Sequence, residues 1–292
     1  MKNKYISFIL CILITFVPLT VSSDEMTVNE ADEHYEIAHG LIKALNSDFS
    51  ISKEDEKVTR AEFIKNLVGI LNAEITDGTG LYFKDINKEN QYAPYIKFAL
   101  SHGWVNGGEY FYPDDAITLE QAVKIGVTAT GHGFLAESRG GYPVGYLQTA
   151  KQNSLIKNLS KETSGLSARD ACVLIFNIVN ADIMEVVSFG DDLKAETRKN
   201  KSLLSLFLNI YSVKGVLSAN QHTNMHDGSH SPRKGKVVIA NQEFYTDNEP
   251  DLLGYNVWVF YKAENDRNTV VYMSPYRNNV VKINNRQIAD IE

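Results

Sequence analysis

Three histidines recur every four residues in the segment 222–230, and this spacing could hold a metal. They are His222, His226 and His230, with Asp227 beside the second. On a helix, this spacing would put three imidazoles on one face, where they could bind zinc. The segment also contains glycine, serine and proline, which favour a loop, where such spacing carries little information. We therefore predict a solvated loop with no metal or cofactor, and zinc binding is the alternative.

The other reactive residue types lack a catalytic motif. No G-x-S-x-G turn surrounds a serine, and neither a Gly-rich phosphate loop nor an H-E-x-x-H pair is present. The paired carboxylates Asp114–Asp115 and Asp191–Asp192 fall in expected loops. The catalytic acids of a glycosidase are recognised by the distance between their two carboxyl groups, and a sequence does not show that distance. Cys172 lies in an apolar helical run, so we expect a buried core residue rather than a nucleophile. The chain is predicted to be non-catalytic, with a hydrolase in its C-terminal part as an alternative.

Three of the predicted helices that could position a site start with the same helix-capping pattern. A hydroxyl residue is followed three positions later by an acid or amide, and an apolar residue precedes each hydroxyl. The pairs are Thr59 with Glu62, Thr118 with Gln121, and Ser167 with Asp170. In such a capping box, the hydroxyl accepts from the first turn of the helix while the second side chain reaches back. Three copies indicate three helix starts of one kind.

Each of these helix starts begins the second helix of a helix–loop–helix unit, and the clearest unit spans 83–131. Its first helix is predicted to stop at Gly103, its loop to run to Pro113, and its second helix to open at Thr118. The predicted units span 30–80, 81–131 and 140–187. A unit of this length cannot bury its own apolar face, so we expect the three to pack as one helical domain.

The sequence period changes after the third unit. Residues 188–202 are polar and charged and are predicted to form a linker or an exposed helix, and 203–292 a β-rich domain. Its strands are expected at 208–219, 236–245, 254–262, 269–274 and 279–283. They are rich in valine, isoleucine and tyrosine and are separated by turn residues, which predicts a small antiparallel barrel or sandwich. The fold class is therefore a multidomain α plus β chain, with an all-α bundle followed by this barrel or sandwich.

The net charge and the N-terminal segment limit the expected partners and location of the protein. The 292 residues carry a net charge of −7 without a basic stripe, so nucleic acid is not an expected partner. Lys2 and Lys4 precede an apolar run and the small residues 21–23, which predicts a secretory signal peptide over 1–23; an uncleaved anchor is the alternative. Cleavage would remove two of 29 basic residues and none of the 36 acidic ones, leaving −9. The mature chain is then exported, has no membrane contact, and keeps one cysteine, so no internal disulfide forms.

The three units resemble S-layer homology domains, the wall-anchoring repeats of bacterial surface proteins. The resemblance rests on five motifs in combination and covers about half of the chain. They are VTRAE at 58–62, FKDI at 83–86, GWVNG at 103–107, FYP at 111–113 and GGYPVGY at 140–146. It implies a pseudo-threefold helical bundle whose inter-repeat grooves bind secondary cell-wall polysaccharide, often bearing a pyruvate ketal. The protein would then be non-covalently attached to the cell wall.

The site that this resemblance implies centres on Arg60, with Thr59 and Glu62. An arginine at the first turn of a helix can offer a planar fork to a carboxylate, beside backbone N–H groups and a dipole that favour anions. Because the chain is acidic overall, recognition of an anionic sugar must be local. Trp104 is expected either to stack on a sugar or to pack in the core. The alternatives are helix capping for Thr59 and Glu62 and an exposed surface charge for Arg60.

The second and third units depart from the motif at the arginine position. Leu119 and Ala168 stand there, and Arg169 comes one residue late, about 100° around the helix, so it is expected to point elsewhere. We therefore expect one strong groove, in the first unit. The alternative function is a structural protein whose degenerate repeats no longer bind glycan and which self-associates instead.

Overall fold

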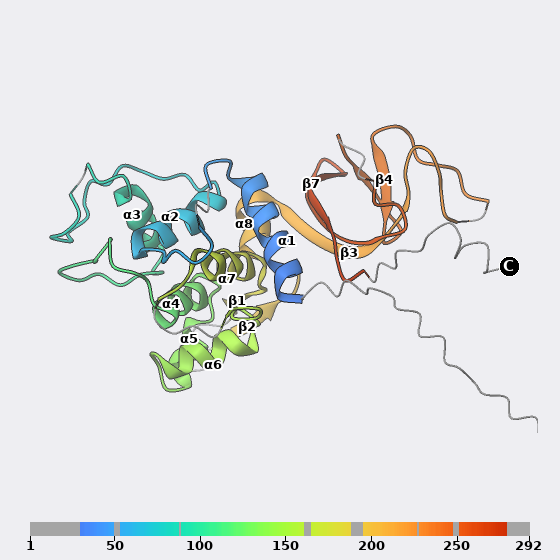
Figure 1. The fold of residues 1–292 in the computed structure, drawn as a ribbon. Coiled ribbons are helices and arrows are strands. Elements are labelled where there is room, and N and C mark those ends of the chain that lie inside the picture. Colours follow the sequence, from blue (N-terminus) through green and yellow to red (C-terminus); the bar gives the residue numbers. More distant parts are fainter. Residues whose placement is uncertain are drawn as a thin grey trace, which may run out of the picture. The chain divides into compact units, whose positions relative to one another are not determined.

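Helices form the N-terminal part of the chain and strands the C-terminal part, so the fold is α plus β (Figure 1). The computed structural model describes residues 30–278 apart from 50–52, 88, 161–164, 188–194, 227 and 248–250. The predicted signal peptide and the predicted strand at 279–283 lie outside the described residues.

Seven helices precede the first strand in the described part of the chain. They are α1 (Glu30–Leu45), α2 (Arg60–Ile70), α3 (Ala93–Ser101), α4 (Leu119–Ala129), α5 (Gly133–Ser138), α6 (Val144–Gln152) and α7 (Ala168–Asn180). The predicted capping boxes of α2 and α4 are confirmed. At α7, Ser167 Oγ accepts from the Asp170 N–H at 3.1 Å, but the Asp170 carboxylate bonds Ser160 instead of reaching back. The third capping box is therefore only half formed.

Each capped helix packs on the opening helix of the next unit. Helix α2 packs on α3, α4 on α6, and α7 returns to α1. The residues just before the three caps are joined in a ring of backbone hydrogen bonds. Val58 N–H donates to Leu166 O (3.1 Å), Leu166 N–H to Ile117 O (2.9 Å), and Ile117 N–H to Val58 O (2.9 Å). All three side chains are buried, so this ring lies at the centre of the helices.

The remaining described elements are mostly strands. They are β1 (Ile183–Val186), β2 (Ala195–Arg198), α8 (Leu203–Leu208), β3 (Ile210–Ala219), β4 (Lys236–Ile239), β5 (Gln242–Tyr245), β6 (Asn256–Glu264) and β7 (Arg267–Pro275). Five strands close on themselves in the order β3-β4-β5-β7-β6. The sheet is mixed rather than antiparallel, because β5 pairs with β7 in parallel. The single strand predicted at 236–245 is two strands, joined at Ala240–Asn241, where both residues have positive φ as a two-residue hairpin turn requires.

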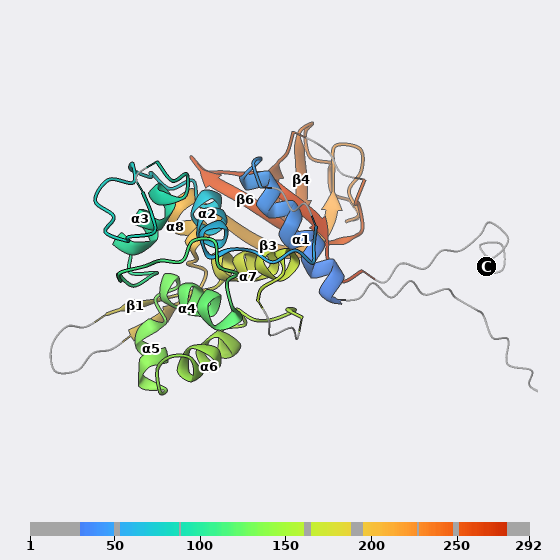
Figure 2. The same cartoon turned by 60° about the vertical axis from the view of Figure 1, so that its left-hand side comes forward.

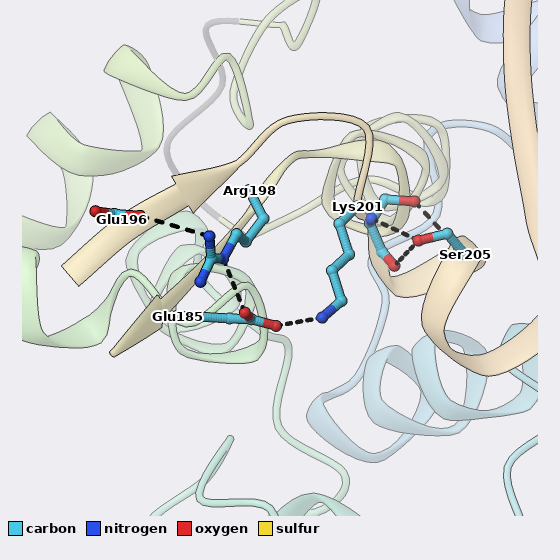
Figure 3. A network of polar contacts seen from close by, with 6 residues as sticks. Glu185, Glu196, Arg198, Lys201 and Ser205 are labelled. Atoms are coloured by element: carbon cyan, nitrogen blue, oxygen red, sulfur yellow. Dashed lines mark hydrogen bonds and ion pairs between the residues drawn. The ribbon is translucent and has the colours of Figure 1, made fainter. Parts of the chain in front are cut away.

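The stretch 188–202, predicted as a linker or exposed helix, contributes a strand. Its residues 195–198 form β2, which pairs antiparallel with β1. The Glu185 carboxylate lies between Arg198, at 3.0 Å from its Nε, and Lys201 (Figure 3). Directly after Lys201, Ser202 and Ser205 form the capping box of α8. Alternating strand geometry and these ion pairs therefore order a segment whose composition alone is that of a linker.

Strand β6 is buried on both faces, which explains its apolar sequence. Val257 and Val259 pack inside the closed sheet, in a buried cluster with Leu217, Val237, Ile239 and Phe244. Trp258 and Phe260 face the helices, where the Phe176 ring of α7 lies 5.3 Å from the Trp258 ring, centroid to centroid. The helices and the closed sheet thus share one hydrophobic core. Figure 2 shows α1 and α7 beside the strands of this sheet.

Candidate functional site

Asp85 fixes the loop that precedes α4. Its carboxylate accepts from the Phe111 N–H at 2.9 and 3.1 Å and from the Tyr112 N–H at 2.6 Å. Tyr112 has a φ of 60°, a left-handed conformation that costs free energy for a residue with a side chain. The rings of Phe83 and Phe111 also lie 5.5 Å apart. The FKDI and FYP motifs therefore meet, and the aspartate holds the turn that presents Phe111.

Arg60 lies against this turn. Its Nε donates to Phe111 O at 3.0 Å, and its Cζ lies 4.8 Å from the centroid of the Phe111 ring. The side chain is half-buried, and burial lowers the pKa of Arg60, although a guanidinium stays charged. Within the described part of the chain, no carboxylate forms an ion pair with it. The fork is thus oriented by Phe111 while its two terminal nitrogens remain open to a ligand.

Exposed tyrosines and a second cation surround Arg60. Tyr112 is 56% exposed and Tyr142 49% exposed, and Tyr142 is close enough to Arg60 to interact with it electrostatically. Lys124 Nζ lies 5.4 Å from the Tyr142 ring centroid and 6.0 Å from that of Tyr146. We call Arg60, Phe111, Tyr112, Tyr142 and Lys124 the arginine groove, after the inter-repeat groove that the sequence predicts at Arg60. Its tyrosines and Lys124 were missed from the sequence, because residues from three units meet here only in the fold.

Thr59 and Glu62 do not share the arginine groove. They cap α2: Glu62 N–H donates to Thr59 Oγ1 at 3.2 Å and Thr59 N–H to Glu62 Oε2 at 2.9 Å. Both line a different cavity of about 370 Å³, whose other lining residues include Lys65, Asn66 and Tyr92. The structure therefore places Thr59 and Glu62 on a different cavity from Arg60, because neighbouring helix positions point in different directions. A role of Thr59 and Glu62 in glycan binding stays a prediction.

The N–H groups at the start of α2 are also already bonded. Arg60 N–H donates to Asp115 O at 2.9 Å and Ala61 N–H to Pro113 O at 3.1 Å. The expected backbone contribution to anion binding is thus corrected, because loop carbonyls of the next unit take these donors. The side chain of Arg60 is left as the charged group of the site.

Trp104 is a core residue. It is only 4% exposed, and its ring lies 5.5 Å from that of Phe98 and 5.9 Å from that of His102. No face of the indole is available to a sugar. Of the two roles expected for Trp104, the structure therefore places it in packing, and the stacking role is corrected.

Arg169 points away from the groove, as expected. Its guanidinium pairs with Asp32 at 2.6 Å and with Glu54 at 3.0 Å, and its Cζ lies 4.2 Å from the Tyr35 ring centroid. Arg169 is thus paired with carboxylates of α1 and of the loop that follows it. Leu119 and Ala168, at the motif positions of α4 and α7, are partly buried and bring no charge.

Neither the histidine segment nor the cysteine forms a reactive centre in the described residues. No group of three metal-ligating side chains occurs among them, and Asp227 lies outside them. Cys172 is 1% exposed, and burial raises the pKa of its thiol to about 12. The prediction of a buried core cysteine is confirmed.

Comparison with known proteins gives this geometry a family. The model of the S-layer homology domain matches residues 82–123, the unit that contains Asp85, the Phe111 turn and the start of α4. Residues 82–123 are therefore similar to an S-layer homology domain. The chain is also 24% identical over 180 residues to the middle cell wall protein of Brevibacillus brevis, an alignment that covers 59% of this chain. The aligned part is 16% of that relative, so the chain spans only a small share of its length.

The S-layer homology match and this relative indicate a protein of the cell wall or cell surface. Within the described residues, no helix has the length and hydropathy needed to cross a membrane. The family match covers the second unit, and S-layer homology repeats in the first and third units remain predictions.

Proposed function

We propose that this chain is a non-catalytic protein that attaches to the cell wall by binding an anionic secondary cell-wall polysaccharide in the arginine groove. The observation that carries the proposal is the half-buried, oriented Arg60 guanidinium without an ion-pair partner among the described residues. A guanidinium held in this way can take a carboxylate, such as that of a pyruvate ketal, through two parallel N–H···O bonds.

We further infer that the three units are three S-layer homology repeats related by a pseudo-threefold axis. The ring of hydrogen bonds among Val58, Ile117 and Leu166 supports this arrangement, since each residue uses its N–H and its C=O in the same sense. The cyclic packing of α2 on α3, α4 on α6 and α7 on α1 supports it as well. Three inter-repeat grooves follow from such an axis, and only one of them contains the motif arginine.

The aromatic residues of the arginine groove suit a sugar ligand. Tyr112 and Tyr142 offer partly exposed rings for the apolar faces of sugar rings, and their hydroxyls can donate or accept. Lys124 adds a positive charge near Tyr142. Because the chain has a net charge of −7, attraction of an anionic polymer has to come from local cations such as Arg60 and Lys124.

The test is co-sedimentation of the chain with purified cell walls, before and after hydrofluoric acid extraction of their polysaccharide. Arg60→Ala is compared with Arg60→Lys, which keeps the charge but loses the fork, and with Arg267→Ala. Arg267 is an exposed arginine at the β6–β7 turn, so its loss changes the net charge equally without touching the groove. We expect binding to vanish on extraction and to fall about tenfold or more in Arg60→Ala, with Arg60→Lys intermediate.

Binding that is indifferent to both extraction and Arg60→Ala would refute the groove. Ordered assembly of the isolated protein without polysaccharide would favour the structural, self-associating alternative. Turnover of wall fragments would favour an enzyme.

A further inference from the structure

A cavity lies along the first residues of β3, beside the end of α7, and no part of the proposed wall attachment uses it. Tyr211 of β3 and Tyr261 of β6 are direct cross-strand partners there, with ring centroids 6.1 Å apart. The Tyr261 ring lies 5.0 Å from that of Phe244, which belongs to the apolar cluster inside the sheet. Gln242 precedes Phe244 by two positions on β5 and therefore lies on the same face. Tyr211, Tyr261 and Gln242 line a cavity of about 370 Å³, which we call the sheet mouth.

The rim of the sheet mouth comes from the segment that joins the helices to the sheet. Asp182 follows α7, and Asn200 follows β2, with the Asn200 N–H donating to Asp182 Oδ1 at 3.0 Å. The ion pairs of Glu185 with Arg198 and Lys201 hold this turn on both sides of Asn200 (Figure 3). The rim is thus a built feature of the fold and brings two polar side chains to the cavity.

Polar groups in the sheet mouth are left without protein partners. In the residues that the structure describes, the amides of Asn200 and Gln242, the hydroxyls of Tyr211 and Tyr261 and the second oxygen of Asp182 have no hydrogen-bond partner. Tyr211 is only 37% exposed, yet its ring and hydroxyl border the cavity. Amides, a carboxylate and phenols together offer donors and acceptors that can pair with adjacent hydroxyl groups. Cavities of roughly 300–1,000 Å³ are of the size that holds small ligands.

From this arrangement we propose that the sheet mouth is a second carbohydrate-binding site, specific for a neutral saccharide. Asp182 is the only ionisable acid among its lining residues, and no lysine or arginine lines it. An anionic sugar would be repelled there, in contrast to the arginine groove. The two tyrosine rings can cover the apolar face of a sugar ring, while Gln242, Asn200 and Asp182 bond its hydroxyls. The proposal does not depend on glycan binding at Arg60.

The experiment is ligand-observed saturation-transfer NMR on the full chain, followed by titration calorimetry. The probes are two neutral disaccharides, di-N-acetylchitobiose and maltose, and one anionic disaccharide, digalacturonic acid. Tyr211→Ala and Gln242→Ala are compared with Tyr82→Ala, which removes an 88% exposed tyrosine from the helical part of the chain. Because Tyr211 and Gln242 are both exposed, these variants should fold, and circular dichroism checks this. Arg60→Ala tests independence from the arginine groove.

We expect at least one neutral disaccharide to bind and digalacturonic acid not to bind at this site. Tyr211→Ala should weaken binding about tenfold, and Gln242→Ala severalfold, while Tyr82→Ala and Arg60→Ala leave it unchanged. No binding of either neutral disaccharide at millimolar concentration would overturn the proposal. So would binding that Tyr211→Ala leaves intact, a preference for the anionic probe, or a sheet mouth that binds a polypeptide instead.

Discussion

Gly40 marks the contact between helix α1 and strand β7, and its replacement by alanine tests that contact. A Cβ at residue 40 would lie 2.0 Å from Tyr272 Oη and 2.4 Å from Tyr272 Cζ. Gly40 sits inside α1 rather than at its end, so alanine would ordinarily favour the helix by about 0.5–1 kcal/mol. Overpacking of this kind costs about 1–3 kcal/mol. The clash should win, and we expect Gly40→Ala to lower the free energy of unfolding by about 1–2 kcal/mol.

A double-mutant cycle separates the clash from the helix effect. Tyr272→Ala removes the obstructing ring and should destabilise the chain by itself, since Tyr272 is largely buried against the shared core. In that background, Gly40→Ala should stabilise by about 0.5–1 kcal/mol, because the helix effect alone remains. The assay is urea unfolding followed by circular dichroism, with the midpoint compared at an unchanged slope. The sign of the Gly40→Ala effect is thus expected to reverse.

Gly133→Ala is the matched control. Its added Cβ would meet only Thr128 atoms, at 3.8 and 4.0 Å, which is ordinary contact, so no loss of stability is expected. If Gly40→Ala stabilised the chain with Tyr272 present, α1 and β7 could not lie as close as the structure has them. The shared core of helices and sheet would then be refuted at its closest approach.

Two further predictions concern the groove turn and the buried histidine. Asp85→Ala should lower the free energy of unfolding by about 1–3 kcal/mol and weaken wall binding, because the Phe111 turn loses its hydrogen-bond acceptor. The measurements are urea unfolding and co-sedimentation with cell walls. Asp114→Ala is the control: Asp114 is exposed, and its loss should have little effect in either assay. His132 is 1% exposed, and burial lowers its pKa below the ordinary 6.5, so the unfolded chain binds the proton more readily. Stability should therefore fall as the pH drops below about 6.5. Urea unfolding at a series of pH values should show a shallower fall of the free energy of unfolding in His132→Asn. The same dependence on pH in both proteins would exclude His132 as a cause.

The helix starts were predictable from sequence because a capping box is local. Its two hydrogen bonds join residues three positions apart, so the pattern at Thr59 and Thr118 specifies them directly. The pattern at Ser167 looks the same, yet Asp170 bonds Ser160, ten residues earlier. A partner at that distance competes with the local one, and only the folded chain decides between them.

The sequence predicted the motifs of the site better than it predicted which of their groups are free to contact a ligand. The sequence identified Arg60 and the Asp85 and Phe111 motifs, but it could not show that Asp115 and Pro113 carbonyls take the N–H groups at the start of α2. Such bonds join residues more than fifty positions apart. For the same reason, the exposure of Trp104 could not be predicted: an aromatic residue after a helix end suits both a sugar platform and a core.

Gly40 illustrates how a repeated pair of residues can serve two purposes. His102-Gly103 follows the end of α3, where Gly103 has a φ of 69° and lets the chain turn. His39-Gly40 aligns with it in sequence but lies within α1. There the glycine is used for the close approach of Tyr272. The same dipeptide therefore ends one helix and docks another on the sheet, a difference that depends on a strand more than 200 positions away.

The burial of Arg60 gives a physical argument for a ligand at its guanidinium. Arg169, Arg198 and Arg277 have carboxylate partners at 2.6 to 3.0 Å, whereas Arg139, Arg233 and Arg267 have none among the described residues. The side chains of Arg198 and Arg277 are exposed, where a pair contributes little. Arg60 is half-buried and forms no ion pair among the described residues, although Asp115 and Asp85 lie near enough to attract its charge. A buried charge without a direct partner is costly. The Phe111 carbonyl and ring offset only part of that cost, and a carboxylate bound from solution would supply the missing interaction where it is worth most.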